Sequence, residues 1–279
     1  MLVTYIVKNV NESVTEEKMS ALFFDIDGTI LSDITHEIPE SALEALKKAQ
    51  ENGHKTFINT GRTVCSIPPV IKNIPFDGFL CGCGTHLVYG DEVIFHHSIP
   101  YERGREIIQS MKNCKVEGFL EGTEDIYYSN RISRLEPVES SRRYMAGLGL
   151  GREQAMEETG YEYDKILIYI DEIADGERFF KETGDVLQHI DRLGGVYECI
   201  QKGYSKATAI ECVKKELHLS DDDIYAFGDS SNDFDMIKAA GHGVIMGKHD
   251  PVLEPYAEYI TDTVEHDGLY KAMEHYGLI

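Results

Sequence analysis

The sequence is short of positive charge and has no long apolar run. It contains 27 lysine and arginine residues against 49 aspartate and glutamate residues, so its formal net charge is -22. Such a charge repels polyanions, which argues against a nucleic-acid or an anionic-membrane partner. No apolar stretch approaches the roughly 20 residues of a transmembrane helix, and the opening MLVTYIVKNVNESV becomes polar too soon for a signal peptide. We therefore expect a cytoplasmic protein.

Proline and cysteine are also sparse. Only 8 of the 279 residues are proline and 42% are hydrophobic, which is typical of a globular chain and not of a disordered or fibrous one. The six cysteines show no paired C-x-x-C spacing and no matching histidine pair, so a zinc site is poorly supported. We expect reduced, mostly buried thiols.

The first and last thirds of the chain alternate short apolar runs with amphipathic stretches. This alternation predicts βα units and a parallel sheet. One helix is expected to begin at the candidate N-cap Ser41 and to stop at Gly53, a natural left-handed C′ residue. A second is expected to begin at Ser205 with SKATAIECVKKELHL, and a third, NDFDMIKAAG, to close on Gly241 as the first does on Gly53. The expected strands are Ala21–Phe24, Thr56–Asn59, Gly78–Cys81, Ile224–Phe227, Gly243–Met246 and Glu258–Thr261.

The middle of the chain has a different pattern. HLVYGDEVIFHHSI predicts a hairpin that turns at Gly90 and Asp91. One helix is expected to open at Pro100 and another to lie near residues 175–190, while KILIYI predicts a strand. The βα pattern resumes only after this segment, so the segment reads as a separate α+β unit inserted into the α/β unit.

The expected fold class is therefore α/β, with a Rossmann-like, doubly wound parallel sheet as the core and an inserted α+β cap domain. We expect residues 1–81 and 196–279 to form the core, and residues 82–195 to form the cap. Residues 1–18 precede the first expected strand and are an N-terminal extension of uncertain role.

Two aspartates directly follow the first expected strand, in ALFFDIDGTI. Residues two apart in a strand project to the same side, so Asp25 and Asp27 are expected to face the crevice at the carboxyl end of that strand. Two carboxylates this close are tolerated when a cation lies between them or when one keeps its proton. One can then attack phosphorus while the other acts as general acid. The alternative is a turn with Asx-type capping.

Gly28 and Thr29 complete this motif. The glycine lets backbone N–H groups approach a phosphate closely, and the threonine adds a hydroxyl. After the second expected strand, FINTGR places Thr60, Gly61 and Arg62 where they can meet phosphate oxygens, although the segment can also be a plain loop.

Two motifs in the last third point to the same crevice. KGYSKA places Lys206 at a helix start, where its ammonium and the helix N-terminus can meet an anion; the alternative is a surface lysine. FGDSSNDFDM offers Asp229, Asn232 and Asp233 after a strand, and such hard oxygen ligands suit Mg²⁺. Helix capping by Asn232 and dipole compensation by Asp233 are the alternatives, and both interpretations can hold together.

The ordered set DIDGT, NTGR, KGYSKA and GDSSND resembles the haloacid dehalogenase superfamily, in particular its Cof-type phosphatases with a large cap between the second and third motifs. The resemblance covers the chain from about Ala21 to its end. It implies that Asp25 is the nucleophile that becomes phosphorylated and that Asp27 is the general acid and base. It also implies that Thr60 and Lys206 bind the phosphoryl group, with Lys206 restraining Asp25.

The same resemblance implies a Mg²⁺ ion. Its ligands would be Asp25, the carbonyl of Asp27 and Asp229, with Asn232 and Asp233 completing the shell. Two segments depart from the family pattern: CGCGTHL stands where an Asn-Gly pair is usual, and MGKHDP where Asn-Ala is common. The first departure bears on what the cap presents to a substrate.

The cap contains several arginines and histidines with no role in these motifs. One or more of the arginines can reach a second anionic group of a substrate, and the alternative is a solvated face. His96 and His97 alternate faces in an expected strand, so at most one of them points to the crevice. The four arginines are Arg131, Arg134, Arg142 and Arg143.

We expect a Mg²⁺-dependent phosphatase that hydrolyses a small phosphorylated metabolite, a sugar phosphate or a phosphorylated cofactor, through an aspartyl phosphate. The alternatives are a phosphomutase on the same scaffold and a catalytically silent regulatory binding protein. The expected partner is that metabolite, with no nucleic acid and no membrane, and the chain is expected to be a monomer or a homodimer.

Overall fold

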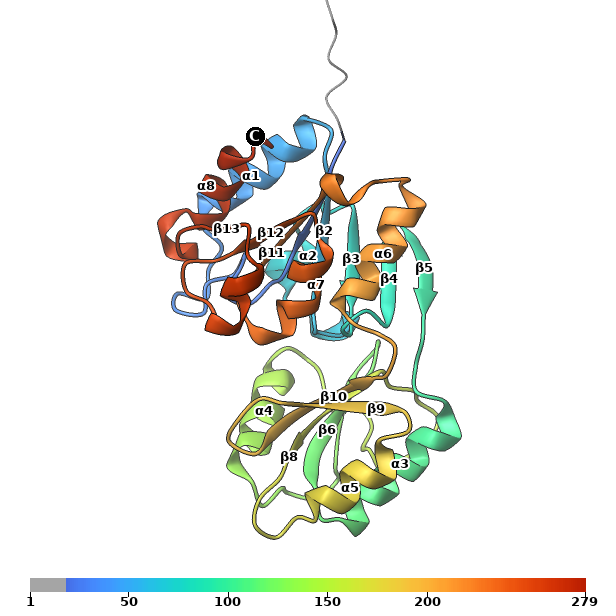
Figure 1. The fold of residues 1–279 in the computed structure, drawn as a ribbon. Coiled ribbons are helices and arrows are strands. Elements are labelled where there is room, and N and C mark those ends of the chain that lie inside the picture. The colour runs from blue at the N-terminus through green and yellow to red at the C-terminus, as the bar shows by residue number, and fades with distance from the viewer. Residues whose placement is uncertain (1–18) are drawn as a thin grey trace, which may run out of the picture.

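The structure is a computed structural model, and it describes residues 19–279. These residues form two bodies joined at a narrow waist (Figure 1). The expectation about the extension 1–18 lies outside the described residues. Within residues 19–279, no helix combines the length and the apolar character needed to cross a bilayer.

The larger body is built on an eight-stranded sheet in the order β13-β12-β11-β1-β2-β3-β4-β5. The strands from β13 to β3 run parallel, whereas β3, β4 and β5 are antiparallel neighbours. All six strands expected in the core are present. The strands are β1 (Ala21–Phe24), β2 (Lys55–Asn59), β3 (Gly78–Cys81), β4 (His86–Tyr89), β5 (Glu92–His96), β11 (Ile224–Gly228), β12 (His242–Ile245) and β13 (Tyr259–Ile260).

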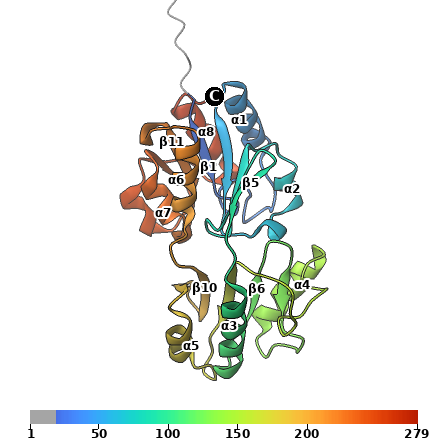
Figure 2. The ribbon, with the colours of Figure 1, turned by 90° about the vertical axis from the view of Figure 1, so that its right-hand side faces the viewer.

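Helices cover both faces of this sheet, as the doubly wound class requires. Figure 2 shows α1 and α2 on one side and α6 and α7 on the other. The helix α8 packs against α1. The helices of this body are α1 (Glu40–Glu51), α2 (Pro69–Lys72), α6 (Lys206–Glu216), α7 (Phe234–Ala239) and α8 (Gly268–His275).

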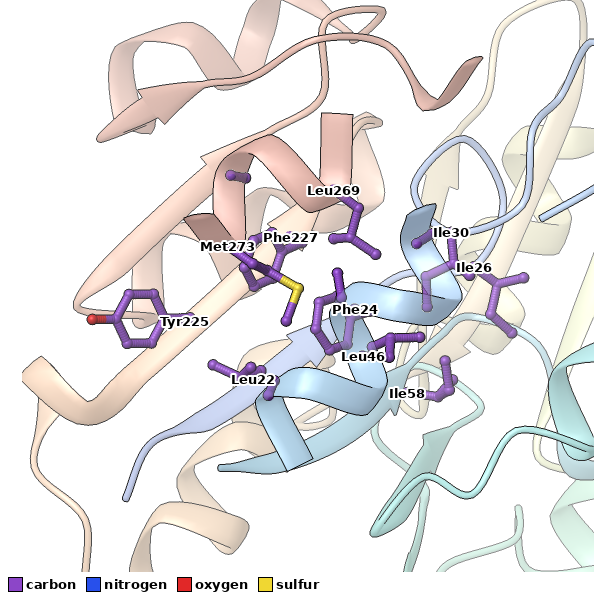
Figure 3. Packing of buried hydrophobic residues seen from close by; sticks show 14 of the residues in the cluster. Leu22, Phe24, Ile26, Ile30, Leu46, Ile58, Tyr225, Phe227, Leu269 and Met273 are labelled. Atoms are coloured by element: carbon purple, nitrogen blue, oxygen red, sulfur yellow. The ribbon is translucent and has the colours of Figure 1, made fainter. Parts of the chain in front are cut away.

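The central strand β1 is fully buried because both of its faces are covered. Leu22 and Phe24 point to the α1 and α8 side, where Phe24 stacks on Phe227 with ring centroids 4.7 Å apart (Figure 3). Phe23 points to the opposite side and stacks on Phe57. This two-sided burial explains why the strand reads as a continuous apolar run before Asp25.

The smaller body is a five-stranded antiparallel sheet in the order β7-β6-β8-β10-β9. On one face α3 and α5 pack through Ile107 and Phe179, and on the other face α4 packs through Val138. Its elements are α3 (Tyr101–Asn113), β6 (Glu117–Glu121), β7 (Ile126–Tyr128), α4 (Glu136–Gly147), β8 (Lys165–Tyr169), α5 (Gly176–Thr183), β9 (Leu187–Asp191) and β10 (Val196–Gln201).

Three strands, β4, β5 and β10, lie in a different sheet from the one that the expected boundaries at residues 82 and 195 give them. The hairpin β4-β5 turns where expected, but β4 pairs with β3 and so extends the core sheet. Strand β10 lies between β8 and β9 in the inserted sheet. A hairpin signal specifies the turn but not the sheet that the hairpin joins. We therefore propose that the boundaries lie in the connections 97–100 and 202–205.

Three local expectations were wrong. Pro39, not Ser41, is the N-cap of α1, because the Ser41 hydroxyl donates to Asp267 instead. The helix expected near 175–190 is α5, which ends at Thr183, and β9 follows it. Gly241 follows the C-cap of α7 as Gly53 follows that of α1, but it does not adopt the left-handed conformation of Gly53. By contrast, Ser205 caps α6 as expected, since its hydroxyl oxygen accepts hydrogen bonds from two backbone N–H groups.

Candidate active site

The carboxyl ends of β1, β2 and β11 lie side by side, because these strands are parallel neighbours in the sheet. Asp25 follows β1, Thr60 follows β2 and Asp229 follows β11. Lys206, the first residue of α6, reaches the same place: its Nζ lies 2.7 Å from Asp25 Oδ1 and 2.6 Å from Asp233 Oδ1. The structure therefore brings together side chains that are up to 208 positions apart in the sequence, from Asp25 to Asp233.

Three carboxylates form the floor of this site. Asp25, Asp229 and Asp233 each offer an oxygen, and these oxygens all lie within 4.8 Å of one another. Asp233 is held by the backbone N–H groups of Asp229 and Ser230, at 2.9 and 3.0 Å from its Oδ2. With one ammonium among three carboxylates, the cluster has an excess of negative charge when it is fully ionised.

Protonation follows from this imbalance. Burial raises the pKa of Asp25 to about 7, against the lowering effect of Lys206, and Asp233 adds to the rise. Burial also raises the pKa of Asp229 to about 8, with Asp233 and Asp25 as further causes. Burial opposes the charge on Lys206, but Asp233 and Asp25 outweigh it and hold its pKa above the usual value. Asp25 and Asp229 therefore keep protons near neutral pH unless a cation displaces them.

A divalent metal ion fits this donor set. The three candidate ligand atoms are carboxylate oxygens, which are the ligands of hard cations. Their position is reinforced by Thr29, whose hydroxyl donates to Asp229 Oδ1 at 3.1 Å. Asp25, Asp229 and Asp233 would hold such an ion. The carboxylate of Asp27 lies outside this group.

Gly28 occupies a position that no other residue fits. Its φ is +78°, and a Cβ atom built there would lie 2.4 Å from Asp229 Oδ2. Both the backbone conformation and the close approach of the carboxylate therefore require glycine. The glycine expected to admit a phosphate closely in fact admits the side chain of Asp229.

Asp27 has different surroundings from Asp25, although both follow β1. The Asp27 side chain is 44% exposed, against 6% for Asp25. Arg62 binds it with two hydrogen bonds, from Nε to Oδ2 at 2.7 Å and from the terminal nitrogen Nη2 to Oδ1 at 2.8 Å. Such a two-pronged contact orients the carboxylate strongly. Asp25 thus belongs to the buried cluster and Asp27 to the open side of the site.

A pocket of ≈ 430 Å³ lies above the cluster and between the two bodies. The core contributes six of the expected site residues to its lining: Asp25, Asp27, Thr60, Gly61, Arg62 and Asn232. Lys206, Asp229, Asp233, Gly28 and Thr29 are outside this lining. The Thr29 hydroxyl, expected to meet a phosphate, is fully buried and donates to Asp229 instead.

Sequence reasoning missed the charged residues that the inserted body places on this pocket. Lys165 pairs with Glu198 and, at 3.5 Å, with Glu121, and its Nζ also donates to the carbonyl of Gly61 at 2.9 Å. Arg192 pairs with the other oxygen of Glu198. Burial acts to raise the pKa of Glu198, but Lys165 and Arg192 overcome it and bring the pKa to about 2.

The four arginines singled out in the sequence lie elsewhere. None of them lines the pocket, and each pairs within the inserted body: Arg131 with Glu117, Arg134 with Glu117 and Asp171, Arg142 with Glu139, and Arg143 with Glu136. The arginine that faces the pocket from the insert is Arg192, in the connection after β9. The sequence around an arginine in a turn does not indicate whether its side chain faces a pocket. His96 and His97 also lie outside the pocket lining.

This fold and site define an enzyme class: a hydrolase with an aspartate-rich site at the carboxyl edge of a parallel sheet, covered by an inserted α+β body. The sequence profile of the haloacid dehalogenase-like hydrolases matches residues 22–273. The chain belongs to this family.

Relatives over the full length agree with this assignment. YkrA of Bacillus subtilis is 29% identical over 264 residues, covering 92% of this chain and 98% of its own. The 5-amino-6-(5-phospho-D-ribitylamino)uracil phosphatase YitU of the same organism is 25% identical over 272 residues, covering 94% of this chain and 98% of its own.

Solved structures show the same architecture. BT1666 of Bacteroides thetaiotaomicron, a phosphatase of this superfamily, superposes with a TM-score of 0.79 at 28% identity, over 99% of this chain and 100% of its own. The subclass IIB sugar phosphatase BT4131 superposes with a TM-score of 0.78 at 27% identity, over 94% and 100%. The chain is a Cof-type phosphatase of the haloacid dehalogenase superfamily, and its enzyme class is phosphoric monoester hydrolase.

Proposed function

We propose that this phosphatase is Mg²⁺-dependent and hydrolyses a small phosphorylated metabolite through a phosphoryl group carried on Asp25. The observation that carries the proposal is the position of Asp25, which lines the pocket while Lys206 and two further carboxylates surround it from below. Mg²⁺ at this cluster would supply the positive charge that lets a carboxylate approach a phosphate.

Asp25 has one carboxylate oxygen available to attack phosphorus. Lys206 occupies Oδ1, which leaves Oδ2 as the oxygen for bond formation with phosphorus. In the first step the Asp25–phosphorus bond forms and the bond from phosphorus to the ester oxygen breaks. Thr60 and Gly61 line the pocket beside Asp25 and are placed to bind the phosphoryl oxygens.

Asp27 carries the protons. As an acid it gives a proton to the leaving alcohol, and as a base it then takes one from the water that attacks phosphorus. Water attack releases inorganic phosphate and restores the Asp25 carboxylate. Arg62 orients Asp27 through its two hydrogen bonds.

The substrate class follows from the pocket. Its volume of ≈ 430 Å³ lies in the range of small-molecule sites, about 300 to 1,000 Å³. Both bodies line it, so a protein-bound phosphate would have to displace the insert. Lys165, Arg192 and Glu198 present charged and hydrogen-bonding groups suited to the hydroxyl or anionic groups of a sugar phosphate or a phosphorylated cofactor. The names of YitU and BT4131 support this class.

A phosphate-release screen tests the proposal. Purified protein with Mg²⁺ is incubated with a panel of phosphorylated metabolites, and inorganic phosphate is measured. We expect release from sugar phosphates or phosphorylated cofactors, and none from Asp25→Asn, which keeps the shape of the side chain. A phosphomutase would rearrange a sugar phosphate without releasing phosphate, and a silent binding protein would do neither. Undiminished release by Asp25→Asn would refute the role of Asp25.

A further inference from the structure

Two histidines and an aspartate meet where the inserted body joins the core. His86 on β4 and His96 on β5 are directly opposite each other in the antiparallel register. Opposite residues share a face of the sheet, and the two rings lie with centroids 4.5 Å apart. Asp164, just before β8 of the insert, places Oδ1 2.9 Å from His96 Nε2. One ligand atom from each of the three lies within 4.8 Å of the others.

A hydroxyl marks the centre of this group. Thr123 Oγ1 lies 3.0 Å from His96 Nε2, 3.5 Å from His86 Nδ1 and 3.3 Å from Asp164 Oδ2. Ser98 Oγ is 2.9 Å from Asp164 Oδ1. One small atom can therefore contact all three side chains at once, which is the geometric condition for a shared metal ion.

Burial and access also suit a bound cation. His86 is 5% and Asp164 1% exposed, so two of the three groups are fixed by their surroundings. His96, whose side chain is 30% exposed, lines an open pocket of ≈ 560 Å³ that provides an entry path. Glu124 and Glu162 line the same pocket and add negative charge near the entrance.

We propose that His86, His96 and Asp164 form a Zn²⁺ site that bridges the core sheet and the inserted body. Two imidazoles and one carboxylate, with a fourth position for water or a hydroxyl, are a characteristic donor set for this ion. The set differs from the oxygen-only cluster around Asp25, which suits hard cations. The spacing of cysteines and histidines in the sequence does not indicate this site, because Asp164 is 68 positions from His96.

The proposed site lies beside the two connections between the core and the insert. The chain passes between the two bodies at residues 97–100 and 202–205. His97 ties these two crossings together: its Nδ1 is 2.8 Å from Gln201 Oε1, and its ring stacks on Tyr204. Because His86 and His96 belong to the core sheet and Asp164 to the insert, an ion bound by all three would hold the insert in a fixed orientation.

Calorimetry tests the binding. Protein freed of metal with a chelator is returned to saturating Mg²⁺, which occupies the oxygen cluster, and is titrated with Zn²⁺. We expect one Zn²⁺ per chain and at least a tenfold weaker affinity in His96→Gln, about the smallest loss seen when a metal site is perturbed. His97→Gln is the matched control and should bind as the wild type does. No binding, or equal binding by His96→Gln, would overturn the site.

Co²⁺ provides a second readout that needs no variant. In saturating Mg²⁺, Co²⁺ bound by two imidazoles and a carboxylate in a low-coordinate site gives strong visible absorption, whereas Co²⁺ in an all-oxygen octahedral site absorbs weakly. We expect the strong bands at one equivalent. Their absence from the wild type would contradict the proposed ligands even if His96→Gln failed to fold.

Phosphate release tests the bridge itself, and this part depends on the proposed phosphatase activity. Zn²⁺ at one equivalent in saturating Mg²⁺ should slow turnover of the wild type and of His97→Gln, because the insert must move for substrate to enter. Zn²⁺ should not slow the turnover of His96→Gln. Equal inhibition of all three proteins would place the effect at the oxygen cluster and refute the bridge, while leaving the binding result to stand on its own.

Discussion

The structure contains two buried ionic clusters that face the same pocket from opposite sides, and they differ in charge balance. In the core, Lys206 stands among Asp25, Asp229 and Asp233, one cation against three carboxylates. In the insert, Lys165 and Arg192 stand against Glu121 and Glu198, two against two. In the balanced cluster each carboxylate pairs with at least one cation. The unbalanced cluster has an excess of negative charge, which protons or a bound cation can offset.

The pKa values follow this difference. Burial raises the pKa of Asp25 to about 7 and that of Asp229 to about 8, so both groups hold protons where an ordinary aspartate has lost them. Glu198 is also buried, yet Lys165 and Arg192 together bring its pKa to about 2. Burial raises the pKa of Glu121, which pairs with Lys165 alone. Burial alone therefore does not decide ionisation. The number of opposite charges within reach decides it.

Replacing the lysine should mainly lower activity in the core cluster and mainly lower stability in the insert cluster. Lys206→Met should lower kcat at least about 10²-fold, because it removes a charge that acts on the reacting carboxylate. Lys165→Met should cost about 3 to 5 kcal/mol of unfolding free energy, since it leaves Glu121 and Glu198 without their shared partner, while kcat changes much less. Chemical denaturation and phosphate-release kinetics measure the two effects. A Lys165→Met protein that is stable but inactive would contradict the distinction.

Metal dependence and pH should be coupled in the core cluster. EDTA should abolish turnover and Mg²⁺ should restore it. Since Mg²⁺ must displace protons from Asp25 and Asp229, its affinity should rise by up to about tenfold per pH unit for each proton released, between about pH 6 and 8. Calorimetric titration with Mg²⁺ at several pH values checks this. An affinity for Mg²⁺ that does not change with pH would show that Mg²⁺ displaces no protons from these two groups.

Stability without metal should respond to pH in a definite direction. The folded pKa values of Asp25 and Asp229 lie above the ordinary 3.8, so between about pH 4 and 8 the folded state binds more protons than the unfolded state. The stabilising contribution of these two groups is complete below about pH 4 and is lost as the pH rises towards 8. The difference in Tm between Mg²⁺ and EDTA samples should therefore widen from pH 5.5 to 8.5. A narrowing difference would contradict the raised pKa values.

The smallest effect is expected at the pocket wall. Arg192→Gln should lower kcat/KM about tenfold, as expected for losing a charged hydrogen bond to substrate, with kcat changed less. Arg131→Gln is the matched control, because Arg131 lies outside the pocket lining and pairs with Glu117. Steady-state kinetics of both variants on the best substrate of the panel measure the loss in each. An equal loss in both variants would show that Arg192 acts only through general stability.

The core sheet and its acidic residues could be predicted from the sequence, because each strand is a short apolar run and its polar site residues follow directly after it. Parallel topology then brings distant strand ends together, as it does Asp25 and Asp229. The sheet to which β4 and β5 belong could not be read, since a hairpin carries no signal of its neighbour. Lys165 and Glu198 were missed because a charged residue within an amphipathic strand usually faces solvent.

Side-chain direction was the other source of error. Thr29 belongs to the expected motif, but its hydroxyl turns to Asp229 and not to the pocket. Ser41 has the right identity for a helix cap, but Asp267, 226 positions away, accepts its hydrogen bond. In both cases a tertiary partner outcompetes the local one, and tertiary partners are known only when the chain is folded.

Detection of a phosphoryl group on Asp25 tests the account most directly. The Asp27→Asn variant, which lacks the base for water attack, is mixed with Mg²⁺ and p-nitrophenyl phosphate, whose phenolate leaves without needing the acid, and is then quenched in acid, digested and examined by mass spectrometry. The account predicts a phosphorylated peptide whose modified residue is Asp25, absent in EDTA and in the Asp25→Asn, Asp27→Asn double variant. Phosphate release from the wild type with a phosphoryl group on another residue would contradict it.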